Sequence, residues 1–76
     1  MDDTLNPIYW DSTYEIVINL MNHYPTVDPD VVGTQQLLEM ILDLPNFLDE
    51  PELAHEGLLV EILRIWYEEY EEAFSS

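Results

Sequence analysis

The most regular pattern of hydrophobic and polar residues lies in the last third of the chain. Between Leu58 and Phe74, apolar residues recur at steps of three and four, which places them on one face of a helix. These residues are Leu59, Ile62, Leu63, Trp66, Tyr70 and Phe74. At about 100° per residue the charged residues fall on the opposite face; they are Glu61, Arg64, Glu68, Glu71 and Glu72. Leu58 and Ile65 widen the apolar stripe, so the pattern predicts a central helix on which several elements pack.

A first helix is predicted after Ser12, which forms a capping box with Glu15. In such a box the serine side chain accepts the amide of the glutamate, and the glutamate side chain reaches back. The apolar face of this helix holds Ile16, Val17, Leu20, Met21 and Tyr24. Tyr24 and Pro25 end the helix, because a residue before proline disfavours the α conformation.

A second helix is predicted from a cap at Thr34 to a stop at Pro45. Its inward residues are Leu37, Leu38, Met40, Ile41 and Leu44. Between the two helices, Asp28 and Pro29 predict a single helical turn, because aspartate caps helices and proline suits their first position. Gly33 is predicted to stop that turn in the left-handed conformation.

The connection from Asn46 to Pro51 is predicted to be irregular, with Phe47 buried and Asp49 and Glu50 exposed. A capping pair of Asp49 and Glu52 predicts a short helical turn before the long helix, and Gly57 disfavours a continuous helix from that turn. No alternation typical of a strand has a useful length. The sequence therefore predicts a mainly α, three-helix domain spanning residues 1–76, with frayed ends at 1–7 and 75–76.

The charge of the chain restricts its partners. Seventeen Asp and Glu oppose one basic residue, Arg64, giving a net charge of −16 over 76 residues. This charge repels a phosphate backbone and favours a cation or a basic protein surface. The apolar residues make up 47% of the chain, which indicates a folded core rather than a disordered acidic tail. No nucleic-acid binding is predicted, because several Lys or Arg contacts are needed.

Several classes of site and location are excluded or disfavoured by composition. The chain has no cysteine, which excludes disulfides, thiolate zinc sites and direct cysteine ligation of an iron–sulfur cluster. No positively charged segment precedes an apolar run, and no apolar run approaches 18 residues, so secretion and membrane spanning are not expected. The predicted location is cytoplasmic.

Catalysis finds no support in the motifs. No nucleophile–base pair, glycine-rich phosphate loop or cofactor signature is present, so the sequence predicts a protein that is not an enzyme. Asp11 and Ser12 are similar to the Asp-Ser of acyl carrier proteins, whose modified serine opens a helix in the middle of the chain. Ser12 precedes the first helix, so a capping role accounts for it, and a phosphopantetheine mass increment on Ser12 would identify a carrier.

Four carboxylates are the candidate metal ligands: Asp49, Glu50, Glu52 and Glu56. Oxygen ligands suit hard divalent ions such as magnesium, calcium, manganese or ferrous iron. No calcium-loop pattern is present, so a site here is predicted to be open and weak. The alternative is a solvated acidic loop, which the spacing alone favours.

The remaining candidate residues have simpler interpretations. His23 and His55 are candidate metal ligands, because the histidine imidazole commonly binds metals. His23 is predicted instead to lie near the C-terminus of the first helix, where a cation is favoured. His55 is predicted on the loop surface. Trp66 is predicted to be a core residue, and Arg64 to pair with Glu61 or Glu68 on the surface.

A set of residues at fixed spacing runs without gaps from Trp10 to about Glu71. They are Trp10, Glu15, Ile16, Tyr24, Pro25, Asp28, Pro29, Val32, Ile41, Asp43, Leu44, Phe47, Asp49, Glu50, Pro51, Glu56, Ile62, Trp66 and Glu69. In these positions the chain as a whole resembles the IscX (YfhJ) family of small acidic proteins of bacterial iron–sulfur cluster assembly.

The resemblance implies a modified winged-helix-like fold and an adaptor or regulator that binds the cysteine desulfurase of the assembly machinery. It also implies weak binding of ferrous iron by surface carboxylates of a monomer that holds no cluster itself. The implied contact residues are Glu15, Asp28, Asp49, Glu50 and Glu56. From the residues alone, the chain is an acidic helical interaction module. An alternative role is an acidic decoy that occupies the basic surface of a DNA-binding protein.

The chain departs from the family pattern in several places, including a longer tail from Glu71 to Ser76. Leu48 stands where the family has the first aspartate of an acidic run, Thr34 to Gln36 replace a Phe-Thr-Asp segment, and His55 replaces an asparagine before Glu56. Two family carboxylates are thereby lost. These departures affect the metal site more than the fold.

Overall fold

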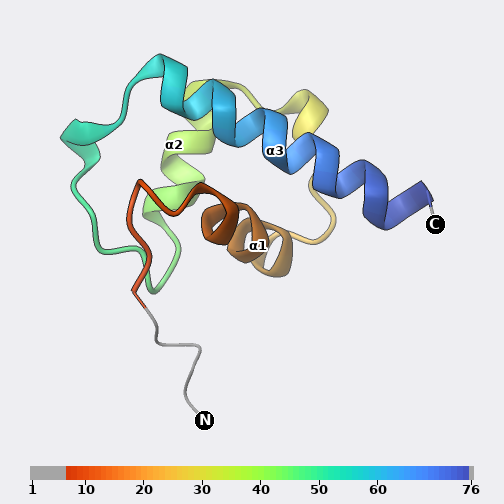
Figure 1. The fold of residues 1–76 in the computed structure, drawn as a ribbon, viewed down its shortest axis with the longest axis horizontal. Coiled ribbons are helices and arrows are strands. Elements are labelled where there is room, and N and C mark those ends of the chain that lie inside the picture. Colours follow the sequence, from red (N-terminus) through yellow and green to blue (C-terminus); the bar gives the residue numbers. More distant parts are fainter. Residues whose placement is uncertain (1–6, 76) are drawn as a thin grey trace, which may run out of the picture.

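Three α-helices carry the fold in the part of the chain that the structure describes (Figure 1). The structure is a computed structural model that describes the backbone of residues 7–75 and the side chains of residues 7–73. The helices are α1 (Thr13–His23), α2 (Thr34–Leu42) and α3 (Glu56–Ser75). The 3-10 turn η2 (Pro29–Val31) connects α1 to α2, and η3 (Pro51–Leu53) lies between α2 and α3.

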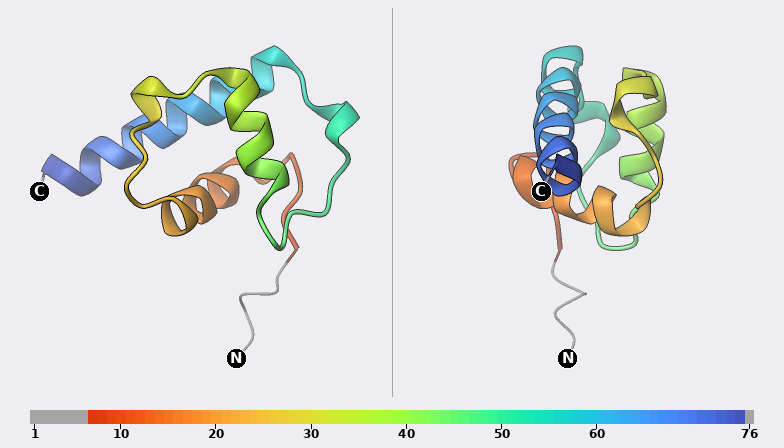
Figure 2. Two further views of the ribbon diagram at one scale, coloured as in Figure 1. Left: turned by 180° about the vertical axis from the view of Figure 1, so that it is seen from behind. Right: turned by 90° about the vertical axis from the view of Figure 1, so that its right-hand side faces the viewer.

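The long helix α3 is the element on which the others pack, as the apolar stripe predicted. Both α1 and α2 pack on it, and η2 packs on it as well. The right-hand view of Figure 2 looks along α3, with α2 and η2 on one side of it and α1 below. Because three elements meet one helix, its apolar face must be wide, and Leu58 and Ile65 are indeed partly buried against the core.

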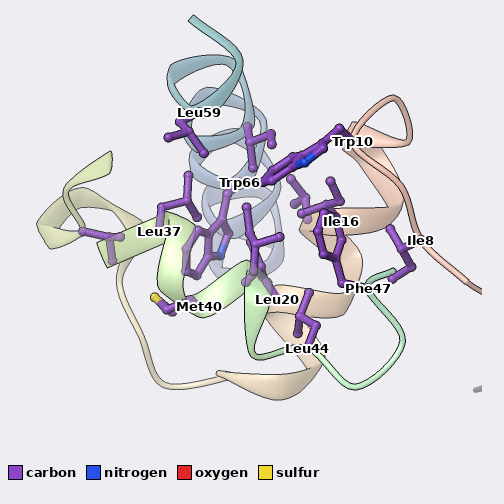
Figure 3. Close-up of a cluster of buried hydrophobic side chains, with 14 residues drawn as sticks. Ile8, Trp10, Ile16, Leu20, Leu37, Met40, Leu44, Phe47, Leu59 and Trp66 are labelled. Atoms are coloured by element: carbon purple, nitrogen blue, oxygen red, sulfur yellow. The ribbon is translucent and has the colours of Figure 1, made fainter. Parts of the chain in front are cut away.

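One hydrophobic cluster forms the core (Figure 3). Its buried members are Ile8, Trp10, Ile16, Val17, Leu20, Val32, Leu37, Met40, Ile41, Leu44, Phe47, Leu59, Ile62 and Trp66. The predicted inward faces of all three helices are confirmed within the described side chains; the expected place of Phe74 lies outside them. Predicted frayed ends at residues 1–7 and 75–76 fall mostly outside the described residues, and Ser75 is the last residue of α3.

The segment before α1 closes the core against the loop after α2. Ile8 forms a parallel β-bridge with Phe47, in which the Ile8 amide donates to the Asn46 carbonyl at 2.9 Å and the Leu48 amide donates to the Ile8 carbonyl at 3.1 Å. The ring of Trp10 meets that of Phe47 edge-to-face, with centroids 4.7 Å apart. Phe47 is buried as predicted. The mainly α, three-helix prediction is confirmed, whereas the winged-helix comparison stays a prediction.

The predicted capping box of α1 is wrong, although the helix begins at the predicted place. Ser12 is the N-cap residue, but its side chain makes no capping hydrogen bond. Its amide already donates to the Tyr9 carbonyl at 3.0 Å in a preceding turn, so Glu15 has no free amide to reach. At the other end, Tyr24 is the C-cap and its amide donates to the Leu20 carbonyl at 2.8 Å, which confirms the predicted end.

The turn at Asp28 and Pro29 is confirmed, but the role predicted for Gly33 is wrong. The Asp28 carboxylate accepts the Asp30 amide at 3.0 Å and caps η2. Gly33 has a φ of −83° and a ψ of 168°, so it is extended rather than left-handed, and it is the N-cap of α2. Thr34 is therefore the first helical residue instead of the cap. Its hydroxyl lies 3.5 Å from the carboxylate oxygens of Glu56, where α2 and α3 begin close together.

The helix α3 begins two residues before its predicted start because His55 caps it. The His55 carbonyl accepts the Leu59 amide at 3.0 Å, and its ring Nδ1 accepts the Leu58 amide at 3.2 Å. A side-chain cap stabilises a helix by about 1 kcal/mol, which offsets the similar cost of a glycine inside the helix. Gly57 is therefore accommodated in the first turn.

The substitution His55→Ala is expected to lower the free energy of unfolding by about 1 kcal/mol, because the Leu58 amide loses its acceptor. His55→Asn is expected to retain most of the stability, since an asparagine side-chain oxygen can accept the same amide. Urea unfolding followed by circular dichroism measures both. Equal losses for the two variants would show that the ring nitrogen does not cap the helix.

Candidate functional site

The acidic residues form a charged surface. No charged side chain is buried among the described residues. Asp49 and Glu69 are half-buried, and the other described acids are exposed. The charge is therefore presented to solvent over every element, which leaves it available to a partner.

Asp49 differs from the exposed acids because its carboxylate hydrogen-bonds the segment that precedes α1. Its Oδ2 accepts the Trp10 amide at 3.0 Å, and its Oδ1 accepts the Glu50 amide at 2.8 Å. The Trp10 indole Nε1 donates in turn to the Glu50 carbonyl at 2.7 Å. The prediction that Asp49 is exposed is therefore wrong: the side chain is half-buried and both its oxygens already accept hydrogen bonds.

The four predicted metal ligands do not converge in this structure. Glu50 and Glu52 are exposed at η3, and Glu56 lies in the first turn of α3 with its carboxylate near the Thr34 hydroxyl. The predicted cap by Asp49 and Glu52 is also wrong, since Glu50 occupies the cap position without a side-chain bond. Among residues 7–75, no three Asp, Glu or His side chains gather around a point that a metal ion can occupy. These residues do not form a ready-made site for ferrous iron.

The five predicted contact acids are also spread over the molecule. Asp28 lies at η2, whereas Asp49 and Glu50 lie next to η3. Figure 1 shows these two turns on opposite sides of the molecule, η2 in yellow and η3 in blue-green. Glu15 is in the first turn of α1 and Glu56 in the first turn of α3. One flat contact therefore cannot use all five residues equally.

The two histidines have structural positions. His23 is exposed in the last turn of α1, as predicted, and its ring meets that of Tyr24 edge-to-face at 5.4 Å. His55 is exposed, as predicted, but its capping role was missed. Neither belongs to a group that can hold a metal in the described part of the chain.

The predicted pairing of Arg64 is confirmed with both glutamates at once. Its guanidinium donates to Glu61 at 2.9 Å and to Glu68 at 3.0 Å. The hydrogen bond to Glu61, with the charges of Glu61 and Glu68, raises the pKa of Arg64. All three side chains are solvent-exposed, so the pairs stabilise the fold little. Their effect is to offset the one basic charge of the chain locally.

A shallow hollow between η2 and α3 was not predicted from the sequence. Its volume is about 380 Å³, and its lining comprises Pro29, Asp30, Val32, Val60, Leu63, Arg64 and Tyr67. A hydrogen bond to Glu71, followed by the charge of Glu71, raises the pKa of Tyr67 above its ordinary value of 10.0. Smaller contributions come from partial burial and from the charges of Asp30 and Asp28.

The substitution Glu71→Gln is expected to lower the pKa of Tyr67 towards its ordinary value. Loss of the Tyr67 proton removes the hydrogen-bond donor and places a phenolate beside a carboxylate, and the neutral amide relieves that repulsion. Ultraviolet absorbance titration of the native chain, of Glu71→Gln and of Tyr67→Phe isolates the Tyr67 transition. A Tyr67 transition at the same pH with and without Glu71 would contradict the assigned cause.

Comparison with known proteins identifies the family. The model of a family described as iron–sulphur cluster assembly matches residues 8–71. The chain belongs to this family, the IscX (YfhJ) proteins. An uncharacterised protein of Pseudomonas aeruginosa is 37% identical over 60 residues, which cover 79% of this chain and 91% of that protein. The IscX family takes part in iron–sulfur cluster assembly as an accessory protein.

Two departures from the IscX pattern can now be explained or located. His55 stands where the pattern has asparagine, a preferred N-cap residue, and its Nδ1 accepts the capping amide instead. That preference was the signal that sequence reasoning missed. Leu48 replaces an aspartate of the pattern and its side chain is exposed. Nothing in the packing explains Leu48.

No helix in the described part of this IscX-family chain has both the length and the apolar character that crossing a bilayer requires.

Proposed function

We propose that this IscX-family protein is a non-enzymatic adaptor that docks on the cysteine desulfurase of the cluster-assembly machinery through its acidic surface. The observation that carries the proposal is the family match over residues 8–71. The charge supports it, since 17 acids oppose one base in a chain of 76 residues. A basic surface on the desulfurase would attract such a chain over long distances and raise the association rate.

The structure supports docking by charge because most of the described acids are exposed to solvent. The one arginine of the chain is already bonded to two glutamates. Solvent-exposed carboxylates on all three helices give a negative field around the whole molecule. We include Glu15 and Glu50 among the contact acids because both are exposed. Glu15 lies on α1 and Glu50 at the start of η3. Asp28 and Asp49 have capping or bridging bonds of their own, so charge and stability must be separated when they are tested.

We further propose that the acidic surface binds ferrous iron weakly, as cargo and not as a resident cofactor. Since the described acids do not gather in threes, the described part of the chain offers only one or two carboxylates to an ion at a time. Water molecules must complete the coordination, which keeps the affinity low. Glu50, Glu52 and Glu56 are the leading ligands. Asp49 can contribute only the oxygen lone pairs that do not accept the Trp10 and Glu50 amides. The monomeric state and the cytoplasmic location belong to the same proposal.

Charge reversals test the docking. Glu15→Lys and Glu50→Lys are each expected to slow association with the desulfurase and to reduce its dependence on ionic strength, because exposed interfacial charges act mainly on the association rate. Glu39→Lys on the exposed side of α2 is the matched control, since it changes the net charge equally. Stopped-flow mixing at low and moderate salt, with calorimetry for the affinity, provides the measurement.

The outcomes separate the parts of the proposal. Association rates that respond neither to salt nor to any reversal would exclude acidic docking. Absence of binding to the cognate desulfurase at low salt would exclude this partner. An NMR spectrum that stays unchanged as ferrous iron is added would remove the iron-binding role and leave the docking intact.

A further inference from the structure

Exposed apolar residues surround the hollow between η2 and α3. Val60 and Tyr67 line it and are 49% and 41% exposed. Val31, which is 76% exposed, belongs to the η2 turn that forms the opposite wall. Val60 and Tyr67 are seven residues apart and therefore lie on one side of α3, two turns from each other. We call Val60, Tyr67 and the hollow that they line the Tyr67 face; Val31 lies on the adjoining η2 turn.

Acidic side chains surround this face. Asp30 lines the hollow, and Asp28, Asp30 and Glu71 act on Tyr67 closely enough to raise its pKa. Glu61 and Glu68 hold Arg64, which also lines the hollow. Five carboxylates thus oppose one guanidinium. The rim is strongly negative, whereas Val60 and Tyr67, which lie among these acids, are apolar and aromatic side chains.

An apolar centre within a charged rim is the arrangement found in protein interfaces, where aromatic residues and arginine carry much of the binding energy. Charge complementarity selects the occupant, because a rim of five acids repels acidic proteins and nucleic acid. A free metal ion gains nothing from the apolar centre. The surface fits a basic protein segment whose apolar side chain enters the hollow.

We propose that the Tyr67 face docks a Lys- or Arg-rich segment of a partner protein, with one aliphatic or aromatic side chain of that segment in the hollow beside Tyr67. The proposal rests on the proposed function in taking the cysteine desulfurase as the protein that carries the segment. It adds an apolar anchor to docking by charge. Of the contact acids implied by the resemblance, Asp28 caps η2 at this face, and Glu50 is the cap residue of η3, a turn on the other side of the molecule (Figure 1).

The anchor and the charges act on different rate constants, so they can be measured separately. Exposed charges steer association, whereas a buried apolar contact holds the complex together and acts on dissociation. Val60→Ser and Tyr67→Ser are expected to raise the dissociation rate from the desulfurase about 10-fold each, as for residues at the centre of an interface. Their association rates should stay within about twofold of the native value.

Leu48→Ser and Leu53→Ser are the matched controls. Both leucines are exposed, at 63% and 57%, and both lie near η3 away from the Tyr67 face. The controls should leave the dissociation rate within about twofold of the native value. Circular dichroism confirms that each variant is folded before its kinetics are measured. If the dissociation rates of Val60→Ser and Tyr67→Ser equal the native rate, or if only Leu48→Ser and Leu53→Ser dissociate faster, the Tyr67 face is overturned. The proposed desulfurase partner still stands in either case.

A second arm decides the proposal if the desulfurase does not bind at all. A synthetic lysine-rich peptide with a single central leucine is added to the ¹⁵N-labelled full chain, and a peptide with serine in place of that leucine is the control. The leucine peptide should shift the amide signals of residues 60–67 and 29–32 more than the serine peptide does. Identical shifts from the two peptides, or leucine-dependent shifts confined to residues 48–53, would overturn the Tyr67 face independently of the proposed partner.

Discussion

Trp66→Ala is expected to lower the free energy of unfolding by about 3–5 kcal/mol, the range for removing a large aromatic side chain from a core. Trp66 is fully buried, and in Figure 3 its side chain projects from α3 into the centre of the hydrophobic cluster. A domain of 76 residues has a small free energy of unfolding, because its core is small and the chain has no cysteine to form a disulfide. The variant should therefore be largely unfolded, or unfold at very low denaturant.

Urea unfolding followed by far-ultraviolet circular dichroism measures this loss. Val60→Ala on the same helix is the control, since Val60 is 49% exposed and its truncation should cost less than about 0.5 kcal/mol. If Trp66→Ala unfolds at the same midpoint urea concentration as the native protein, the stability of the hydrophobic cluster does not depend on this side chain. Trp66→Ala is expected to affect the proposed docking on the desulfurase only through this loss of folding.

The fold was predictable where the information is local and repeated. The stripe from Leu59 to Trp66 repeats at helical spacing, and a periodic signal of this kind specifies both the helix and its buried face. The prolines at positions 25 and 29 act on their immediate neighbours, so the end of α1 and the η2 turn were predicted correctly. Phe47 is buried as expected, and its ring packs against that of Trp10.

The capping box predicted at Ser12 failed because one donor, the Ser12 amide, had two possible acceptors. Ser12 could satisfy Glu15 only if its amide were free, but that amide bonds to Tyr9. At α3 the missing signal was a histidine in a role that asparagine usually fills. The candidate sites were less predictable still. The Tyr67 face exists because η2 packs on α3, a contact between residues that no local pattern connects.

The role of Asp49 could not be predicted either, because it depends on a contact between residues that are distant in the sequence. Its partner, the Trp10 amide, is 39 positions away in sequence, so local reasoning could treat the side chain only as one of several loop acids. In the structure, Asp49 and the Glu50 carbonyl bind Trp10 from two directions. The bridge fixes Trp10, which is 5% exposed, against the core.

Asp49→Ala is therefore expected to lower the free energy of unfolding by about 2–3 kcal/mol, because hydrogen bonds to a charged group are lost and the partly buried Trp10 amide is left without an acceptor. Asp49→Asn keeps one oxygen and should lose about half as much. Glu50→Ala removes the same charge from a neighbouring exposed side chain for which no capping bond is present, and should cost less than about 0.5 kcal/mol.

Urea unfolding of the three variants, followed by tryptophan fluorescence, tests this order. Equal losses for Asp49→Ala and Glu50→Ala would show that the effect is one of charge and that the bridge to Trp10 contributes nothing. The expected order has a direct consequence for binding experiments. Asp49→Lys would weaken the proposed docking on the desulfurase by loosening the N-terminal segment, whereas Glu50→Lys changes the charge alone. Only the Glu50 variant therefore reports on docking at this end of the molecule.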